Sequence, residues 1–394
     1  DSLKGRFETR WFTLKRHDKI PNLSLLILAG GKSSRMKKDK SQLPWQDSTT
    51  LTHMLTNSYV YPFERTVISA NRIIEPQEIP DFIRQSSIQD GHTTEYIRNR
   101  GLDTERHLAI VSDRYSDCGP LGGMEAAMRL YPSDRWLILA VDLPFFDFSR
   151  VPALLAADAS EYDAVIPVVD GRENPLAALY KGRVYEKIRA ALAADDYRVR
   201  KIYNKKAVFI DETPYARQYL NMNTPIAYKE ALACAINQNR PVPVVSITAE
   251  TSGTGKTHLI TQVIKELSAQ GYRVGYVKST HHMSTGPKRN SDTDLATRAG
   301  AVCTALIPDG PKKSRAIEDA AFSMSVDLVL IESRRHGLFP KLLVLPPEAG
   351  AAEGDNETVA LVTRRKDTNS VHFNTLHADN ISALAKYIKL LANL

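Results

Sequence analysis

The chain has 394 residues, of which 43% are apolar and 25% charged, a composition typical of folded globular proteins that excludes fibrous and disordered classes. At this length, two domains are the default expectation. The formal net charge is +7. However, no long Lys/Arg block interleaved with aromatic residues occurs, and small anionic ligands are therefore favoured over nucleic acid.

The sequence shows no sign of export or membrane insertion. No run approaches the ~20 apolar residues that a membrane span requires, and the N-terminal segment lacks the apolar stretch of a secretory signal. Cys118, Cys234 and Cys303 stand far apart without CxxC spacing, which argues against a disulfide framework or a zinc site. The sequence therefore predicts a cytoplasmic protein with no membrane partner.

The predicted elements begin after a polar, basic segment, residues 1–21, to which no role is assigned. Short apolar runs then alternate with helical patterns up to Cys234; the runs cover residues 23–28, 66–70, 108–112, 137–141 and 164–167. This alternation predicts βαβ units and a largely parallel sheet over 22–234. Residues 235–243 contain two prolines and predict a linker, because proline breaks a continuing helix. A second strand–loop–helix series, 244–394, follows.

A glycine-rich, basic loop follows the first strand and reads LAGGKSSRMKKDK from Leu28 to Lys40. Gly30 and Gly31 let the backbone approach a ligand and point its N–H groups at anionic oxygens. The side chains of Lys32, Arg35 and Lys40 are candidate charge-assisted donors to a triphosphate. An ordinary Gly-Gly turn is the alternative, and the Arg-Met and Asp-Lys pairs that follow make it less favoured.

Two aspartates follow later strand runs. Asp142 comes directly after 137–141, and ligands of open α/β sheets bind at the carboxyl ends of strands. It is therefore a candidate Mg²⁺ ligand, with a turn or helix cap as the alternative. Asp113 follows 108–112 and precedes the glycine-rich segment 119–123, which is either a turn or a second surface for substrate.

A second phosphate loop follows the strand run 244–248. Residues 250–257 read ETSGTGKT and precede an amphipathic helix, the context of a nucleotide-binding P-loop. Its apolar face comprises Leu259, Val263, Ile264 and Leu267. The predicted nucleotide ligands are Gly253, Gly255, Lys256 for the β- and γ-phosphates, and Thr257, which would also bind Mg²⁺. Glu250 stands where the motif has its first glycine.

Further candidates lie at two later strand ends. Glu332 ends the run 326–331, the place of a Walker-B-like carboxylate, and is predicted to bind metal with Thr257. His281 and His282 follow the strand run 273–277. Because neighbouring side chains on an extended chain point in opposite directions, one substrate contact and one surface residue are favoured over a two-histidine metal site.

Residues 23–234 resemble the molybdenum cofactor guanylyltransferases, which transfer GMP from GTP to molybdopterin and release pyrophosphate. The resemblance rests on LAGGKSSRMKKDK, VSD at 111–113, CGPLGGM at 118–124, VDLP at 141–144 and LNMNTP at 220–225. It implies a Rossmann-like, GT-A-like nucleotidyltransferase domain. Because the two reacting phosphates repel each other, catalysis in such an enzyme is mostly positioning and electrostatics.

The resemblance also implies roles for single residues. GTP would be bound by Leu28, Ala29, Gly30, Gly31, Lys40 and Asp113; Mg²⁺ would be held by Asp142; catalysis would use Asp142, Lys40 and Arg35; and the pterin would lie near Asn221, Asn223 and Arg198. The chain departs from the family pattern at Lys37, where glycine is usual, and at Ser69, where an asparagine can contact GTP.

Residues 244–394 resemble molybdopterin-guanine dinucleotide synthesis protein B, a GTP-binding partner of the transferase. The resemblance rests on SGTGKT, VKSTHH, SDTDLATRAGA at 291–301 and VLIES. It implies a P-loop NTPase α/β domain, with Asp292 near the nucleotide. We expect slow GTP hydrolysis, because no water-positioning Gln or arginine finger is evident.

The two halves together predict a fused guanylyltransferase and GTP-binding accessory domain that uses GTP, Mg²⁺ and molybdopterin. Fusion raises the effective concentration of each half for the other. A molybdenum insertion protein and apo-molybdoenzymes or their chaperones are candidate partners. Two alternatives stay open: a cytidylyltransferase that uses CTP, and a non-catalytic carrier, against which the presence of Asp142, Lys40, Lys256 and Thr257 argues.

Overall fold

The structure, a computed structural model, describes residues 23–30, 38–81, 83, 87–90, 93–100, 104–115, 117–204, 206–251, 253–280, 289, 291–308, 310, 313–333, 339–346, 354–355, 357–365, 370 and 372–394. For 87–107 it describes the backbone alone. The described residues form two compact units. The first unit comprises residues of 23–30 and 49–219, and the second comprises residues of 38–48 and 220–394.

The first unit is built on a ten-stranded mixed sheet. Its centre is parallel, in the order β8 (Arg135–Ala140), β1 (Leu23–Leu28), β4 (Arg65–Ser69) and β7 (Thr104–Val111). The strands at its margins are β6 (Thr93–Arg100) and β5 (Ser87–Asp90) beyond β7, and β11 (Ala177–Lys181), β9 (Ala164–Val169), β10 (Arg172–Glu173) and β12 (Ala207–Asp211) beyond β8.

The prediction of parallel strands is confirmed for the centre of this sheet, whereas pairing at the margins is mostly antiparallel. The reason is that the segments connecting the marginal strands are short. β5, β6 and β7 follow one another too closely for the crossover that parallel pairing requires. Short connections permit only hairpins there.

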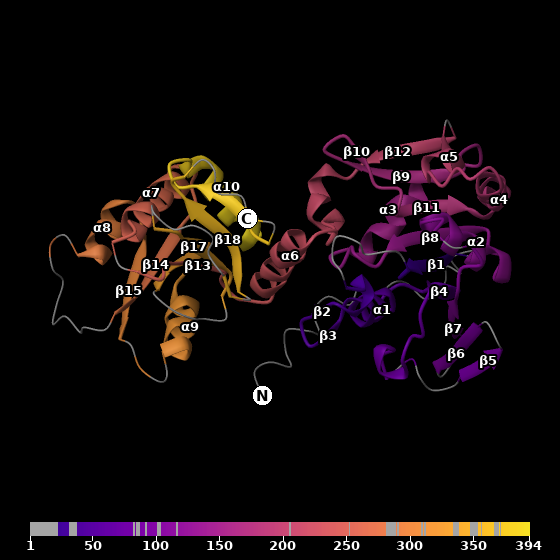
Figure 1. Cartoon of the computed structure of the whole chain (residues 1–394), viewed down its shortest axis with the longest axis horizontal. Helices are drawn as coiled ribbons and strands as arrows, with labels where there is room; N and C mark the ends of the chain where they lie inside the picture. The colour runs from indigo at the N-terminus through magenta and orange to yellow at the C-terminus, as the bar shows by residue number, and fades with distance from the viewer. Residues whose placement is uncertain are drawn as a thin grey trace. The chain divides into compact units, whose positions relative to one another are not determined.

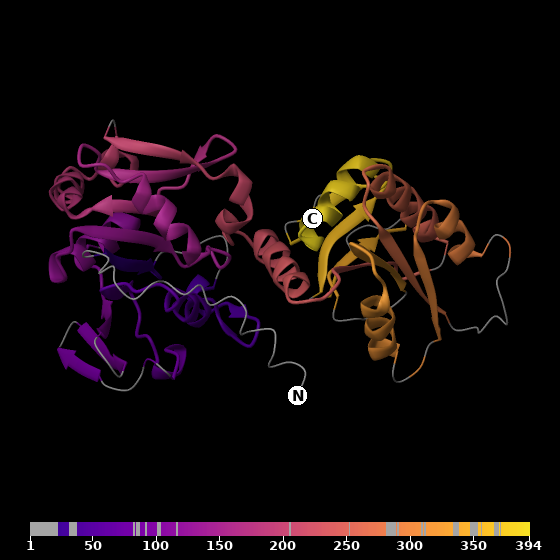
Figure 2. The same ribbon diagram turned by 180° about the vertical axis from the view of Figure 1, so that it is seen from behind.

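Helices cover both faces of the first sheet, as Figures 1 and 2 show from opposite sides. On β1, Leu25 and Ile27 pack in a core with α1 (Thr50–Ser58) and α3 (Val151–Ala156). Leu26 and Leu28 pack in the opposite core with α2 (Pro120–Leu130) and α4 (Tyr185–Ala193). Burial on both faces explains why this strand is a continuous apolar run. Shorter helical segments are α5 (Arg200–Tyr203), η3 (Pro76–Glu78), η4 (Phe148–Arg150), η5 (Gly182–Val184) and η6 (Thr213–Tyr219).

The second unit contains a seven-stranded sheet in which every pairing is parallel. The strand order is β15 (Cys303–Pro308), β14 (Val274–Thr280), β16 (Leu328–Ser333), β13 (Val244–Thr248), β17 (Lys341–Val344), β18 (Thr358–Thr363) and β19 (Asn374–His377). The remaining short elements are η2 (Lys40–Gln42), β2 (Pro44–Trp45) and β3 (Ser48–Thr49).

Helices also cover both faces of the second sheet. α7 (Lys256–Ala269), α8 (Asp292–Arg298) and α10 (Ile381–Ala392) lie on one face, and α9 (Lys313–Ser323) on the other (Figure 1). The predicted apolar face of α7 is confirmed, because its four residues are all buried. Among the described helices, none is long and apolar enough to cross a membrane.

Helix α6 (Pro225–Gln238) continues into residues 235–238, where the sequence predicts the start of a linker. It packs against α10 and β18. The Asn237 side chain donates to the Leu391 carbonyl at 2.8 Å and accepts from the Val244 N–H at 2.9 Å. These contacts stabilise the helix beyond the point that composition predicts, and it ends shortly before Pro241.

Candidate functional site

Four neighbouring strands of the first sheet end at one edge, and a residue that the sequence singles out lies at or just beyond the end of each. Leu28 ends β1, Ser69 ends β4, Asp113 follows β7 and Asp142 follows β8. The ladder continues past the strands, because the Ala29 N–H donates to the Ser69 carbonyl at 2.8 Å. Parallel register therefore lines these residues along the carboxyl edge, where open α/β sheets bind ligands.

Asp113 is held by two side chains from the end of β4. Its Oδ1 accepts from Ser69 Oγ at 2.8 Å, and its Oδ2 accepts from Asn71 Nδ2 at 3.2 Å. Burial raises the pKa of Asp113; the two hydrogen bonds oppose this effect and the nearby Glu125 charge adds to it. This carboxylate is thus partly desolvated and held in a fixed orientation.

Asn71 is a residue that the sequence analysis missed. Its amide lies 3.5 Å from where a Cβ on Gly30 would stand, and its Oδ1 accepts from the Asp113 N–H at 3.2 Å. The sequence analysis considered an asparagine only at the position of Ser69. The one available signal was that Asn71 also follows a strand end, and the structure brings its amide to the glycine-rich loop.

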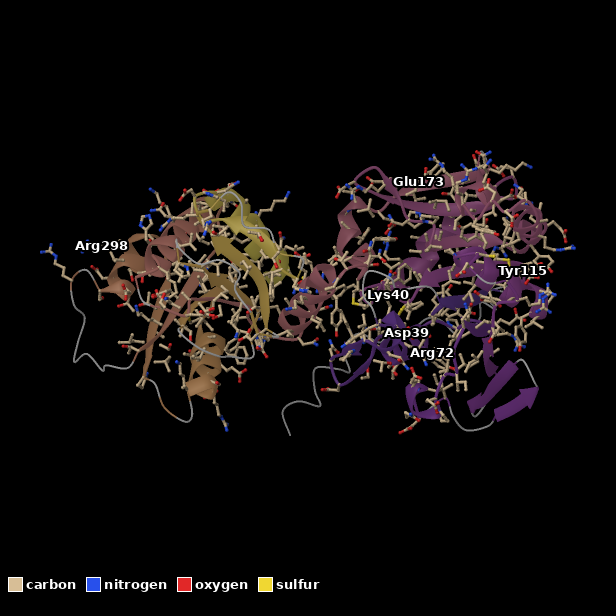
Figure 3. All side chains as sticks on the ribbon, in the orientation of Figure 1. Asp39, Lys40, Arg72, Tyr115, Glu173 and Arg298 are labelled. Carbon is tan, nitrogen blue, oxygen red and sulfur yellow. The ribbon has the colours of Figure 1, made fainter. Side chains whose placement is uncertain are left out.

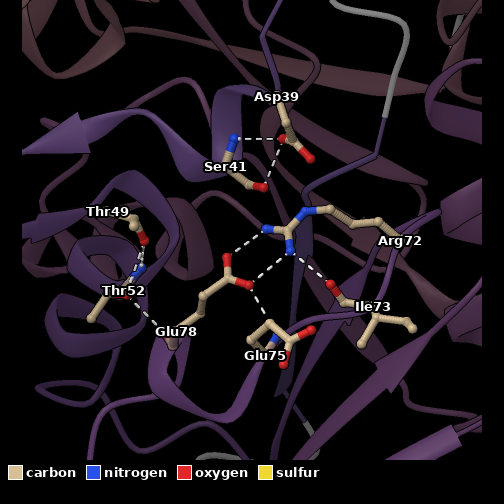
Figure 4. Close-up of polar contacts among 8 residues, drawn as sticks. All are labelled: Asp39, Ser41, Thr49, Thr52, Arg72, Ile73, Glu75 and Glu78. Atoms are coloured by element: carbon tan, nitrogen blue, oxygen red, sulfur yellow. Dashed lines mark hydrogen bonds and ion pairs between the residues drawn. The ribbon is translucent and has the colours of Figure 1, made fainter.

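An ion pair holds the segment next to Asn71. Arg72 donates to Glu78 through Nη1 at 2.8 Å and Nη2 at 2.6 Å, and Nη1 also reaches the Ile73 carbonyl at 2.8 Å (Figure 4). The Glu78 side chain is only 8% exposed and also accepts from the Glu75 N–H at 3.0 Å. This pairing restrains the backbone immediately after the asparagine.

Two glycines let helix α2 approach the same edge. A Cβ on Gly123 would lie 2.4 Å from Ser69 Oγ and 2.8 Å from Leu28 Cδ2. A Cβ on Gly122 would lie 3.1 Å from Asp113 Oδ2. The glycine-rich segment 119–123 is therefore more than a turn, because it brings the N-terminal turn of a helix to the strand ends, where anions are favoured.

Asp142 lies in the turn directly beyond β8 and is 9% exposed. β8 and β7 are on opposite sides of β1, and therefore Asp142 and Asp113 flank the end of the glycine-loop strand. Three of the predicted residues, Gly31, Lys32 and Arg35, lie outside the described residues, as does Lys37.

Lys40 and Asn223 come from separate motifs and meet in the second unit. Lys40 begins η2, which Asp39 caps by accepting from Ser41 N at 2.9 Å and from its Oγ at 2.7 Å (Figures 3 and 4). The Lys40 ammonium donates to Asn223 Oδ1. Asn221 and Asn223 are both exposed. The basic loop and the LNMNTP motif thus share a contact that the sequence did not predict.

Arg198, also predicted near the pterin, belongs to the first unit. Its guanidinium donates to Asp196 through Nε at 2.7 Å and Nη2 at 2.6 Å. The side chain is 72% exposed. This ion pair orients the arginine at the surface.

Two glycines of the predicted P-loop, of which the structure describes all residues but Ser252, have left-handed backbone. Gly253 and Gly255 have φ of +77° and +82°, a left-handed conformation that glycine adopts without strain. Gly255 caps α7, and buried Lys256 donates from Nζ to the Thr251 carbonyl at 3.1 Å. The Glu250 side chain, at the position of the missing glycine, is exposed. Solvent therefore reaches this carboxylate and reduces its repulsion of phosphate.

Glu332 lies next to the first turn of α7. The Thr257 hydroxyl is 2.9 and 3.0 Å from its two oxygens, and the Tyr276 hydroxyl donates to it at 2.6 Å. Burial and the Glu332 charge raise the pKa of Tyr276, which keeps this phenol protonated as a donor. Lys278 Nζ lies 3.2 Å from Glu332 and donates to Asp292. Burial lowers the pKa of Lys278, but its bonds to the two carboxylates outweigh burial and the net shift is upward.

The Thr257 hydroxyl and the Glu332 carboxylate offer oxygen ligands that suit Mg²⁺, which proteins hold through one or two carboxylates together with substrate phosphates. Within the described residues there is no group of three or more His, Cys, Asp or Glu that could hold a metal by itself. Thr257 and Glu332 therefore fit a Mg²⁺ ion that a nucleotide completes. His281 and His282 lie outside the described part of the chain.

Comparison with known proteins finds relatives for each half. Residues 25–209 match the family described as MobA-like NTP transferase domain, and residues 244–364 match Molybdopterin guanine dinucleotide synthesis protein B. A probable molybdenum cofactor guanylyltransferase of Bacillus cereus is 30% identical over 210 residues, which are 52% of this chain and 94% of the relative. One of Carboxydothermus hydrogenoformans is 27% identical over 220 residues, 54% and 96% of the two chains.

Solved structures are also similar to each half. Molybdopterin-guanine dinucleotide biosynthesis protein A of Archaeoglobus fulgidus is 17% identical, covers 53% of this chain and 96% of its own, and has a TM-score of 0.39. MobB of Bacillus subtilis is 23% identical, covers 37% and 97%, and has a TM-score of 0.24. The two family matches by themselves confirm the predicted fold class: a nucleotidyltransferase domain followed by a P-loop NTPase α/β domain.

Proposed function

Because the chain belongs to the molybdenum cofactor guanylyltransferases, a family of nucleotidyltransferases, we propose that it transfers GMP from GTP to molybdopterin and releases pyrophosphate. In this reaction a phosphate oxygen of molybdopterin forms a bond to the α-phosphorus of GTP, and the bond from that phosphorus to the β-phosphate oxygen breaks. The carboxyl edge of the first sheet carries the proposal, since Asp113, Asn71 and Asp142 surround the end of the glycine-loop strand.

Each residue of this edge has a proposed task. The backbone of Leu28, Ala29 and Gly30 binds the nucleotide, and the fixed Asp113–Asn71 pair orients it. Asp142 offers oxygen ligands for Mg²⁺, which would neutralise the phosphate charge when bound. The other predicted roles also stay proposals: Lys40 toward the phosphates, Asn221, Asn223 and Arg198 toward the pterin, and Arg35 in catalysis.

For the second unit we propose that GTP binds at the P-loop through Gly253, Gly255, Lys256 and Thr257, with Glu332 and Thr257 as Mg²⁺ ligands. The buried Lys256 beside the N-terminus of α7 supports this role. We assign the transferase to residues 22–234 and the accessory domain to 244–394. Slow intrinsic hydrolysis of GTP remains our expectation.

The direct test is pyrophosphate release by the full chain with molybdopterin, Mg²⁺ and either GTP or CTP. Release with GTP alone supports the proposal, release with CTP indicates the cytidylyltransferase, and binding without release indicates a carrier. Asp142→Asn should lower the rate by about 100-fold or more, as expected when charge stabilisation of the transition state is lost. The matched control is Asp170→Asn at an exposed turn with φ +48°, a conformation that asparagine tolerates.

A further inference from the structure

An arginine that the sequence analysis did not connect with the P-loop lies against it. Arg364 directly follows β18, two strands from the P-loop strand β13 in the order β13, β17, β18. Its Nη2 and Nη1 are 3.2 and 3.6 Å from where a Cβ on Gly255 would stand. A guanidinium therefore packs against the glycine that precedes Lys256.

Local contacts hold Arg364 in this position while its side chain stays accessible. Its carbonyl accepts from His377 Nε2 at 3.1 Å, and its Nε lies 3.8 Å from Asp379 Oδ1. The Arg364 side chain is 47% exposed and that of Asp379 72%, and such an exposed, long ion pair contributes little. The guanidinium can thus exchange this weak partner for a stronger anion.

A polar group inside the loop also has no partner in the described part of the chain. The Thr254 hydroxyl is buried, in a residue only 6% exposed, and has no hydrogen-bond partner among the described residues. Thr254, Gly255 and Arg364 line, together with apolar side chains such as Leu259 and Val344, a cavity of about 10 Å³, near the size that admits a single water molecule. The loop thus contains a hydroxyl that the described residues leave unsatisfied, and the guanidinium packs against the next residue, Gly255.

Lys256 and Arg364 place two cations near the N-terminus of α7. A polyphosphate carries several negative charges, and the planar fork of arginine pairs with phosphate oxygens at two points. We propose that Arg364 binds the polyphosphate of the nucleotide held by the P-loop, as a second cation beside Lys256. This assignment rests on the proposed GTP binding of the second unit. It adds to the P-loop a side chain from the end of β18.

Calorimetric titration of the full chain with GDP and with inorganic triphosphate tests the assignment. The Lys256→Ala variant is titrated first. The part of the binding signal that is present in wild type and absent in this variant is assigned to the P-loop. Arg364→Gln should weaken the affinity of the P-loop for both ligands by about 10- to 100-fold, the effect expected from the loss of one or two charge-assisted hydrogen bonds. Arg364→Lys should retain part of the affinity, since it keeps the charge but loses the fork.

The matched control is Arg365→Gln, an equal charge change at the next, exposed residue, which should leave both affinities unchanged. Melting of each ligand-free chain shows whether the fold is intact. Equal affinities of Arg364→Gln and Arg365→Gln would overturn the assignment. The assignment would also be overturned if Arg364→Gln weakened the affinity for GDP but not for triphosphate, because Arg364 would then contact the base or the ribose. A wild-type chain without a Lys256-dependent component would instead contradict the proposed function of the loop.

Discussion

The Thr257 hydroxyl lies 2.9 and 3.0 Å from the two carboxylate oxygens of Glu332. This contact joins the first turn of α7 to β16 and collects oxygen atoms beside the P-loop. The Lys278 ammonium, 3.2 Å from the same carboxylate, balances its charge without a metal. A Mg²⁺ ion that uses Glu332 must therefore compete with an ammonium already in contact with it.

Glu332→Gln should weaken GDP binding in the presence of Mg²⁺ by about tenfold or more, because a neutral amide is a poorer magnesium ligand. Binding in EDTA should change much less. The measurement is the Lys256-dependent component of a GDP titration with and without Mg²⁺. Glu266→Gln, an equal charge change near the C-terminal end of α7, serves as the control. An unchanged response to Mg²⁺ would remove Glu332 from the metal site.

Gly123→Ala should destabilise the first unit by about 1–3 kcal/mol, because the new methyl group overlaps Ser69 Oγ and Leu28 Cδ2. This cost exceeds the gain of about 1 kcal/mol in helix propensity. Urea unfolding of the full chain gives the free-energy change. Gly122→Ala is the matched comparison and should cost less, since the atom nearest to its methyl group is Asp113 Oδ2 at 3.1 Å. Equal stability of the two variants would mean that α2 can shift away freely.

Arg72→Met should cost about 2–3 kcal/mol of unfolding free energy, because it leaves Glu78 buried without its guanidinium partner. It should also weaken GTP binding at the first sheet, since Arg72 restrains the segment next to Asn71. Adding Glu78→Gln to Arg72→Met should recover part of the stability, because the unpaired charge is removed. If the double variant were less stable than Arg72→Met, the ion pair would not be the cause.

Asp113 should make the folded chain less stable as pH rises, which is the opposite of the usual effect of a carboxylate. Burial raises the pKa of Asp113 in the folded chain above its ordinary value of 3.8. The stability that it contributes is therefore fully present below pH 3.8 and is lost as pH rises through the folded pKa. The check is urea unfolding of wild type and Asp113→Asn from pH 3.5 to 7, a range set by this shift. The free energy of unfolding of wild type minus that of Asp113→Asn should decline as pH rises. A difference that rises with pH would mean that folding lowers the pKa of Asp113.

Several features of this protein follow from local sequence alone. The largely apolar runs of β1 and β13 predict buried strands, and helices on both faces of each sheet explain why these strands lack an alternating polar face. The motif ETSGTGKT between a strand and an amphipathic helix predicts a phosphate-binding loop, and its Gly253 and Gly255 have the left-handed backbone that glycine adopts without strain. Apolar spacing alone also predicts the buried face of α7.

Other features depend on contacts between distant parts of the chain. The meeting of Asn71 with Asp113 requires the pairing of β4 with β7, and the position of Arg364 against Gly255 requires the order β13, β17, β18. The extension of α6 to Gln238 likewise depends on Asn237 binding to Leu391. Residue spacing encodes burial and backbone conformation, whereas strand order and register decide which side chains meet, because they alone bring sequence-distant groups within hydrogen-bonding distance.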